Sequence, residues 1–188
     1  MGAVSYGRLM VYVENTRGTL MPIVNFEELP DSARIWVYGA DRDLNADEES
    51  KLLDAVDEFL GRWAAHGVPL HNARRWDDRR FLTIGVDKTK EGASGCSIDG
   101  LYRALKALEP SLGAHIVTSG LVYYRGSDGV IHSVTRDEFT DLAAKGAING
   151  DTEVFDLSVT SLNEWRSRFK SRAADSWHAS LMPEASAT

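Results

Sequence analysis

Two stretches with helical spacing, each preceded by a run typical of a β-strand, constrain the fold of this chain more than any other feature. The run Ala33–Tyr38 alternates apolar and polar residues and is rich in β-formers, so it predicts a strand. Asn45 followed by Glu48 forms a capping box that begins a helix, and Gly67 is expected to end it. The apolar residues at helical spacing in between are Leu52, Leu53, Val56, Phe59, Leu60 and Trp63.

A second strand and helix follow in the same order. The apolar run Phe81–Val86 is continuous enough to predict a central strand of a sheet. A helix is expected from Cys96 or Ser97 to Gly113, although Pro110 weakens its last turn. Between the two units, Val68–Arg80 is predicted to be a polar loop. The face expected to point into the core carries Ile98, Leu101, Tyr102, Leu105 and Leu108.

The C-terminal part predicts a hairpin and two short capped helices. Segments His115–Tyr124 and Val130–Val134 flank an Asp-Gly turn, which favours a tight β-hairpin. Thr135 and Ser161 each precede an acid by three residues and are expected to cap helices, with a short strand at Glu153–Asp156 between them. This order predicts an α/β or α+β fold, with a single mixed sheet of about four to five strands and helices packed on it.

Length and composition limit the classes of protein that fit. With 188 residues, one domain over residues 22–182 is expected, with a frayed tail at 183–188. Residues 1–21 are expected to be a poorly ordered leader, or to precede a true start at Met10 or Met21. One cysteine excludes an internal disulfide framework, and five scattered histidines lack the paired spacing of metal ligands.

Charge and hydropathy limit which partners and which cellular location fit this sequence. The net charge of −7 argues against nonspecific binding of nucleic acid. No apolar run reaches the roughly 18 residues of a membrane span, and no signal peptide is visible, so a cytoplasmic protein without a membrane partner is expected.

The first candidate site is the small-residue segment Gly92–Asp99, at the expected start of the second helix. Backbone N–H groups and the helix dipole at such a place suit an anion and lower the pKa of a thiol. Cys96 is therefore a candidate catalytic nucleophile or redox-sensitive thiol, beside four ligand-binding candidates. The alternative is that the small residues serve the turn and Cys96 packs in the core. The ligand-binding candidates are Ser94, Gly95, Ser97 and Asp99.

The second candidate is the basic and aromatic cluster within the expected loop. Arg74, Arg75 and Trp76 could bind a carboxylate, a phosphate or a stacked ring. Asp77 and Asp78 could instead neutralise the arginines in a solvated loop with local ion pairs.

A catalytic Cys–His dyad requires the two side chains to meet in space. If His71 belongs to a loop that enters the strand at Phe81, while Cys96 follows the other end of that strand, about 20 Å separates them. This topology argues against a dyad of His71 and Cys96 unless one of the loops folds back.

The C-terminal segment Trp165–Leu181 combines basic and apolar residues. It could dock on a partner, but large apolar side chains such as Trp165 and Phe169 usually pack within their own fold. We therefore expect the segment to complete the core.

Several segments together resemble a known family. They are Ala33–Tyr38, Trp63–Leu70, Arg80–Leu82, Val86–Asp87, Ala93-Ser-Gly-Cys-Ser-Ile-Asp99 and Asp175–Ala179. They are similar to an uncharacterised family of small bacterial proteins that are commonly labelled "ABC transporter ATPase". The resemblance carries no established activity and no catalytic residue. A Walker A string, which an ATPase of that kind needs to hold the phosphates, is absent from the sequence.

Two functional hypotheses follow. The first is the binding of a small or anionic ligand at the Gly92–Asp99 loop, with Cys96 as a reactive thiol and no assigned cofactor. The second is a non-catalytic module that binds a protein partner or regulates one.

Overall fold

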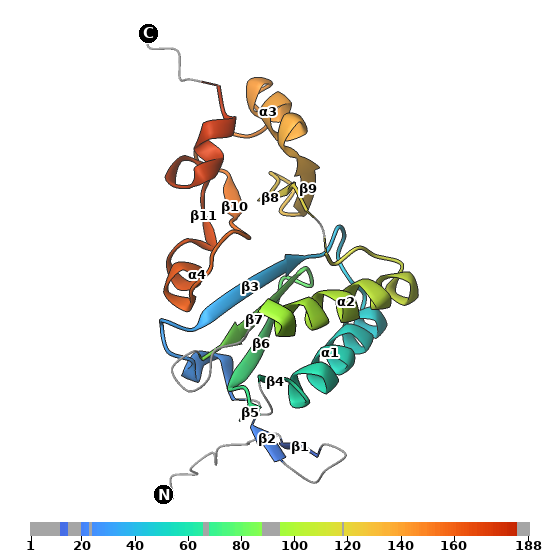
Figure 1. Cartoon of the computed structure of the whole chain (residues 1–188). Coiled ribbons are helices and arrows are strands. Elements are labelled where there is room, and N and C mark those ends of the chain that lie inside the picture. The colour runs from blue at the N-terminus through green and yellow to red at the C-terminus, as the bar shows by residue number, and fades with distance from the viewer. Residues whose placement is uncertain are drawn as a thin grey trace, which may run out of the picture.

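The strands of this chain lie in two main antiparallel sheets rather than one, as the computed structural model shows (Figure 1). The structure describes residues 12–14, 20–22, 24–65, 68–87, 95–117 and 119–183. The first sheet has the order β3–β7–β6 and the second the order β11–β10–β8–β9. The strands are β3 (Arg34–Gly39), β6 (Asn72–Asp77), β7 (Phe81–Val86), β8 (Leu121–Arg125), β9 (Ile131–Thr135), β10 (Glu153–Phe155) and β11 (Lys170–Arg172). The helices are α1 (Ala46–Gly61), α2 (Gly95–Leu112), α3 (Arg136–Ala144) and α4 (Leu162–Arg168).

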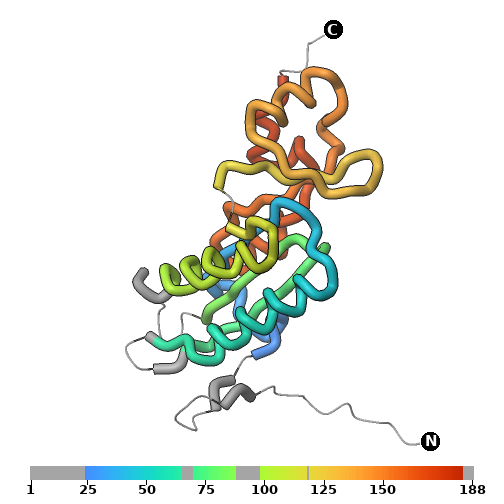
Figure 2. Tube along the Cα trace, turned by 90° about the vertical axis from the view of Figure 1, so that its right-hand side faces the viewer, coloured from blue at the N-terminus to red at the C-terminus, as the bar shows by residue number. Residues whose placement is uncertain are grey.

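Strand β7 is the centre of the first sheet, and all six of its residues are buried. Helices α1 and α2 lie side by side over one face of this sheet (Figures 1 and 2). Because successive residues of a strand point to opposite faces, Leu82, Ile84 and Val86 pack beneath the two helices. The other face packs on a separate apolar cluster, which contains Phe26, Leu29, Ala33, Ile35, Ala73, Val159 and Leu162.

The second sheet carries α3 and two short 3₁₀ segments, η2 (Ala173–Asp175) and η3 (Trp177–Leu181). Thr135 caps α3 with the expected capping box, since its side chain accepts from the backbone of Glu138 and the Glu138 carboxylate accepts from the backbone of Thr135. Asn45 caps α1 in the same way. The short elements elsewhere are η1 (Phe26–Glu28), β1 (Tyr12–Glu14), β2 (Leu20–Pro22), β4 (Ala64–Ala65) and β5 (Val68–Pro69).

A buried arginine and an aromatic cluster join the two sheets. Arg80 is only 5% exposed and donates to the carbonyls of Ala40, Asp41 and Ile131, so it ties the end of β3 to β9. The Tyr123 hydroxyl on β8 donates to the carbonyl of Gly39 at 2.8 Å. The rings that pack at this junction are Phe81, Tyr123, Phe155 and Phe169.

The α+β class is confirmed, but the single mixed sheet is wrong. Every strand pair that the structure describes is antiparallel. The polar loop expected at Val68–Arg80 is also wrong, because most of it forms β5 and β6. Strand β6 pairs with β7 along its whole length and turns into it through Asp78 and Arg79, both with positive φ.

Two details of the helices differ from expectation. Helix α1 ends at Gly61, where the buried Asn72 side chain donates to the Leu60 carbonyl, and Gly67 lies outside the described residues. Tyr102 was expected to face the core, but its side chain is exposed on α2.

Candidate functional site

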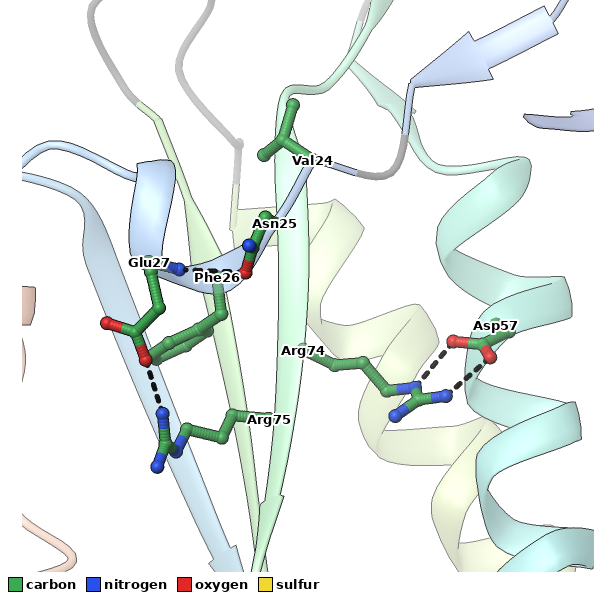
Figure 3. Close-up of a pocket in the computed structure, with 7 residues that line it drawn as sticks. All are labelled: Val24, Asn25, Phe26, Glu27, Asp57, Arg74 and Arg75. Atoms are coloured by element: carbon green, nitrogen blue, oxygen red, sulfur yellow. Dashed lines mark hydrogen bonds and ion pairs between the residues drawn. The ribbon is translucent and has the colours of Figure 1, made fainter. Parts of the chain in front are cut away.

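A hollow of about 330 Å³ lies beside β6 and combines both arginines of the second candidate cluster (Figure 3). Its walls come from three places: β6, helix α1 and the segment that runs into η1. The volume lies within the range of about 300–1,000 Å³ that is usual for binding pockets. The lining residues are Val24, Asn25, Phe26, Glu27, Asp57, Arg74 and Arg75.

Arg74 points from β6 toward α1 and forms a two-bonded ion pair with Asp57. Its Nε and Nη2 atoms donate to the two carboxylate oxygens, each at 2.6 Å (Figure 3). Both side chains are about one-quarter to one-third exposed, at 26% and 33%. A guanidinium has five N–H donors, and no described residue accepts from the other three on Arg74, which can serve solvent or a ligand.

Arg75 points to the opposite side of β6. It donates to Glu27 through Nη1 and to the Asp77 carboxylate through Nε at 3.0 Å. Its guanidinium also lies 5.2 Å from the centre of the Trp165 ring, at a distance where a cation–π contact is favourable. Arg75 is therefore fixed by two carboxylates and one ring.

Neighbouring residues of a strand point to opposite faces of the sheet. A hollow that Arg74 and Arg75 both line must therefore lie at the edge of β6, where the two faces meet. Strand β6 is the outer strand of its sheet, so this edge has no neighbouring strand among the described residues. The opposite edge of the sheet differs, because β3 is partly paired with Thr160 and Ser161.

At this edge, some backbone N–H and C=O groups of β6 form no hydrogen bond with any described residue. The N–H of Asp87 donates to the His71 carbonyl, so the backbone groups of His71 point toward β7. The carbonyl of the next residue, Asn72, points away from β7 and accepts from the N–H of Val24. In an antiparallel pair the direction alternates, so the N–H and C=O groups of Arg74 and Trp76 also face outward. Within the described part of the chain, neither residue has a backbone partner on that side.

The structure brings together Arg74 and Arg75 but separates Trp76 from them. The Trp76 ring packs against the core beneath α1 and α2 and does not line the hollow. Sequence reasoning missed Asp57 and Glu27, the carboxylates that hold the arginines. Asp57 carries a weak signal, because it interrupts the apolar stripe of α1 between Val56 and Phe59.

Residues 92–94 of the Gly92–Asp99 segment lie outside the described residues. Ser94 is not described, and Gly95, Cys96 and Ser97 are described only as backbone in the first turn of α2. Asp99 is exposed and lies 3.7 Å from Arg103, one turn along the helix. The roles predicted for Cys96 and its neighbours stay predictions.

The topological objection to a His71–Cys96 pair is wrong. His71 precedes β6, which runs antiparallel to β7, so it lies at the same end of the sheet as Asp87 and not at the Phe81 end. The chain then passes from Asp87 into α2, which begins at Gly95. The length of β7 therefore no longer separates the two residues, although the Cys96 side chain lies outside the description.

The C-terminal segment docks on its own fold, as expected. Trp165 packs between Phe26 and Phe169 and donates from its indole nitrogen to Thr83. The basic side chains of this segment are engaged in ion pairs, as with Lys170 and Asp78 at 2.7 Å.

Comparison with protein families, curated proteins and solved structures finds no significant match to this chain. The resemblance to the small bacterial family therefore stays a prediction. Among the described residues, no three His, Cys, Asp or Glu side chains gather as metal ligands would. No described helix is both long enough and apolar enough to cross a bilayer.

Proposed function

We propose that this chain is a protein-interaction module that binds an extended polypeptide segment as an additional strand beside β6. The observation that carries the proposal is the hollow at the β6 edge, where Arg74 and Trp76 turn their backbone N–H and C=O groups outward. An added strand uses such groups for its main-chain hydrogen bonds, and its side chains enter pockets on alternate sides. Bacterial origin and a cytoplasmic location stay predictions from the sequence.

The charge state of the hollow favours a peptide over a small anion. Both guanidinium groups already bind carboxylates, so an incoming anion would compete with Asp57 and Glu27. A peptide strand does not need to displace these carboxylates, because its main chain forms hydrogen bonds with the backbone of β6. Its side chains can accept from the guanidinium N–H groups that do not bind Asp57 or Glu27.

The shape of the hollow favours a single strand over a second copy of this chain. Residues 24–27 stand beside the edge on one face, and α1 stands beside it on the other (Figure 3). Paired strands must approach to about 4.8 Å. A flexible segment can enter between these walls. In a dimer of this chain through β6, the walls beside the two strands would collide before the strands came close enough to pair.

Hydrogen exchange of single amides, followed by NMR, tests the proposal. In the unbound protein, we expect the amides of Arg74 and Trp76 to exchange much faster than those of Ala73 and Arg75, which face β7. The probes are three synthetic heptapeptides in which valine alternates with lysine, glutamate or glutamine. At least one should slow exchange at Arg74 and Trp76.

N-methylation of the bound peptide provides the matched control. Methyl groups on the peptide nitrogens that face β6 should abolish binding, because they remove the donors, and methyl groups on the alternate nitrogens should leave it unchanged. If no heptapeptide protects the two amides at millimolar concentration, the proposal is wrong. If acetate or inorganic phosphate shifts the Arg74 and Arg75 side-chain signals and the peptides do not, the site binds small anions instead.

A further inference from the structure

Helix α1 runs antiparallel to β6 and so places its side chains in order along the open edge. At one end, Asn72 contacts the Leu60 carbonyl near the end of α1. At the other end, Arg79 binds the Leu44 carbonyl, just before α1 begins. Asp57 lies between these points, beside Arg74.

Asp54 lies one turn before Asp57 on the same face of α1, and therefore in the direction of Trp76. Arg74 and Trp76 are about 6.6 Å apart along β6, and the three residues from Asp54 to Asp57 rise about 4.5 Å along α1, so the spacing of the two acids roughly follows that of the two strand residues. Asp54 and Asp57 thus flank the part of the edge where Arg74 and Trp76 turn their backbone outward.

The two acids differ in how their charge is balanced. Asp57 is neutralised by Arg74, whereas Asp54 is exposed and, among the described residues, accepts only from the Ser50 hydroxyl, at 3.5 Å. No described lysine or arginine lies within ion-pair distance of Asp54. On the other side of β6, Arg75 shares its single charge between Glu27 and Asp77.

The lining of the hollow is balanced in charge, because Asp57 and Glu27 pair with Arg74 and Arg75, but Asp54 and Asp77 beside it leave the edge of β6 with four carboxylates against two guanidinium groups. We propose, resting on the proposed function, that the segment bound at β6 is basic and carries lysine or arginine at the positions that face α1. Alternate residues of an extended strand share one face, so the basic residues recur at every second position. A long cationic side chain from such a position balances Asp54 without disturbing the pair of Arg74 with Asp57.

The three heptapeptides distinguish this inference from the proposed function itself. At 50 mM salt, we expect the valine–lysine peptide to bind about tenfold more tightly than the valine–glutamate peptide, with the glutamine peptide between them. Raising the salt to 500 mM should shrink that difference, because exposed charges are then screened.

The variant Asp54→Asn should weaken binding of the lysine peptide by about threefold and leave the glutamine peptide unchanged. The matched control is Asp141→Asn, which removes an exposed acid from α3, on the second sheet, and should change neither affinity. Both substitutions are on helix surfaces, so both variants should fold.

Each outcome has a separate meaning. If the glutamate or glutamine peptide binds as tightly as the lysine peptide and protects Arg74 and Trp76, the basic partner is refuted while strand addition stands. If Asp54→Asn and Asp141→Asn behave alike with the lysine peptide, the assignment of its charge to α1 is refuted. If no peptide binds, the proposed function itself fails.

Discussion

Lowering the pH from 7.5 to 5 should destabilise this protein through one buried imidazole. His178, in η3, is fully buried in the core of the second sheet, against Phe139 and Trp177. Its Nδ1 atom lies 2.9 Å from the Ser176 hydroxyl, and its Nε2 atom has no hydrogen-bond partner among the described residues. A proton added at Nε2 would place an unpaired donor and a charge in an apolar core.

Burial lowers the pKa of His178 from its ordinary value of 6.5 to about 4. The nearby Arg136 lowers it further, and Asp156 opposes both effects. Asp156 is itself buried and accepts from the Trp177 indole at 3.0 Å.

The direction of the effect follows from which state binds the proton first. Below about pH 6.5 the unfolded chain takes up a proton at His178 while the folded chain does not, so folding becomes less favourable as the pH falls. The loss ends near pH 4, where the folded state is protonated as well. With these two pKa values, the free energy of unfolding should fall by about 2 kcal/mol between pH 7.5 and pH 5.

Urea unfolding at pH steps between 7.5 and 5, followed by tryptophan fluorescence, measures this loss. The comparison is with His178→Gln and His178→Phe, which cannot titrate. Either variant has its own stability at pH 7.5, but its free energy of unfolding should fall by about 2 kcal/mol less over the same range. Acidic groups with lowered pKa values, such as Glu109 and Glu138, titrate mostly below this window and are common to all three proteins.

An equal pH dependence in the wild type and in both variants would refute the reasoning. So would an NMR titration in which the His178 ring of the folded protein is protonated near pH 6.5.

Four further predictions concern the fold. Gly39→Ala should destabilise by about 1–3 kcal/mol, because the added Cβ would lie 2.6 Å from the buried Tyr123 ring, and an unchanged urea midpoint would contradict this. Arg80→Met should destabilise by about 3 kcal/mol in the same titration, since buried carbonyls lose their donor, and a loss below 1 kcal/mol would show that water replaces it. Asn45→Ala should lower the free energy of unfolding by about 1 kcal/mol through loss of the α1 cap. An unchanged midpoint of thermal unfolding in calorimetry would contradict this. Asp57→Asn should change the free energy of unfolding by less than about 1 kcal/mol, because the ion pair of Asp57 with Arg74 is partly exposed. A larger loss in urea unfolding would show that this pair stabilises the whole fold and does not merely shape the hollow.

Local patterns predicted the helices and the apolar strands well. The capping boxes at Asn45 and Thr135 gave the starts of α1 and α3, and the apolar run Phe81–Val86 gave the central strand. These features depend on residues within one or two turns of each other, so the sequence contains their full cause. Strand β11 was missed, because its three residues are polar and are held by pairing with β10.

The candidate site was predicted only in part. Arg74 and Arg75 were singled out for their charge, but their segment was assigned to a loop because its polar residues hide a strand. Asp57 and Glu27, which neutralise the arginines, come from elements 17 and 48 residues away in the chain.

The sequence by itself determined which segments form helices and apolar strands, because capping and hydrophobic periodicity are local. Only the tertiary structure decided that Asn72–Asp77 is a strand, that the longer strands divide between two main sheets, and that Arg74 and Arg75 line one hollow. The physical reason is that pairing with β7 satisfies the backbone of β6 and distant carboxylates compensate its charges. Neither interaction leaves a pattern in the six residues themselves.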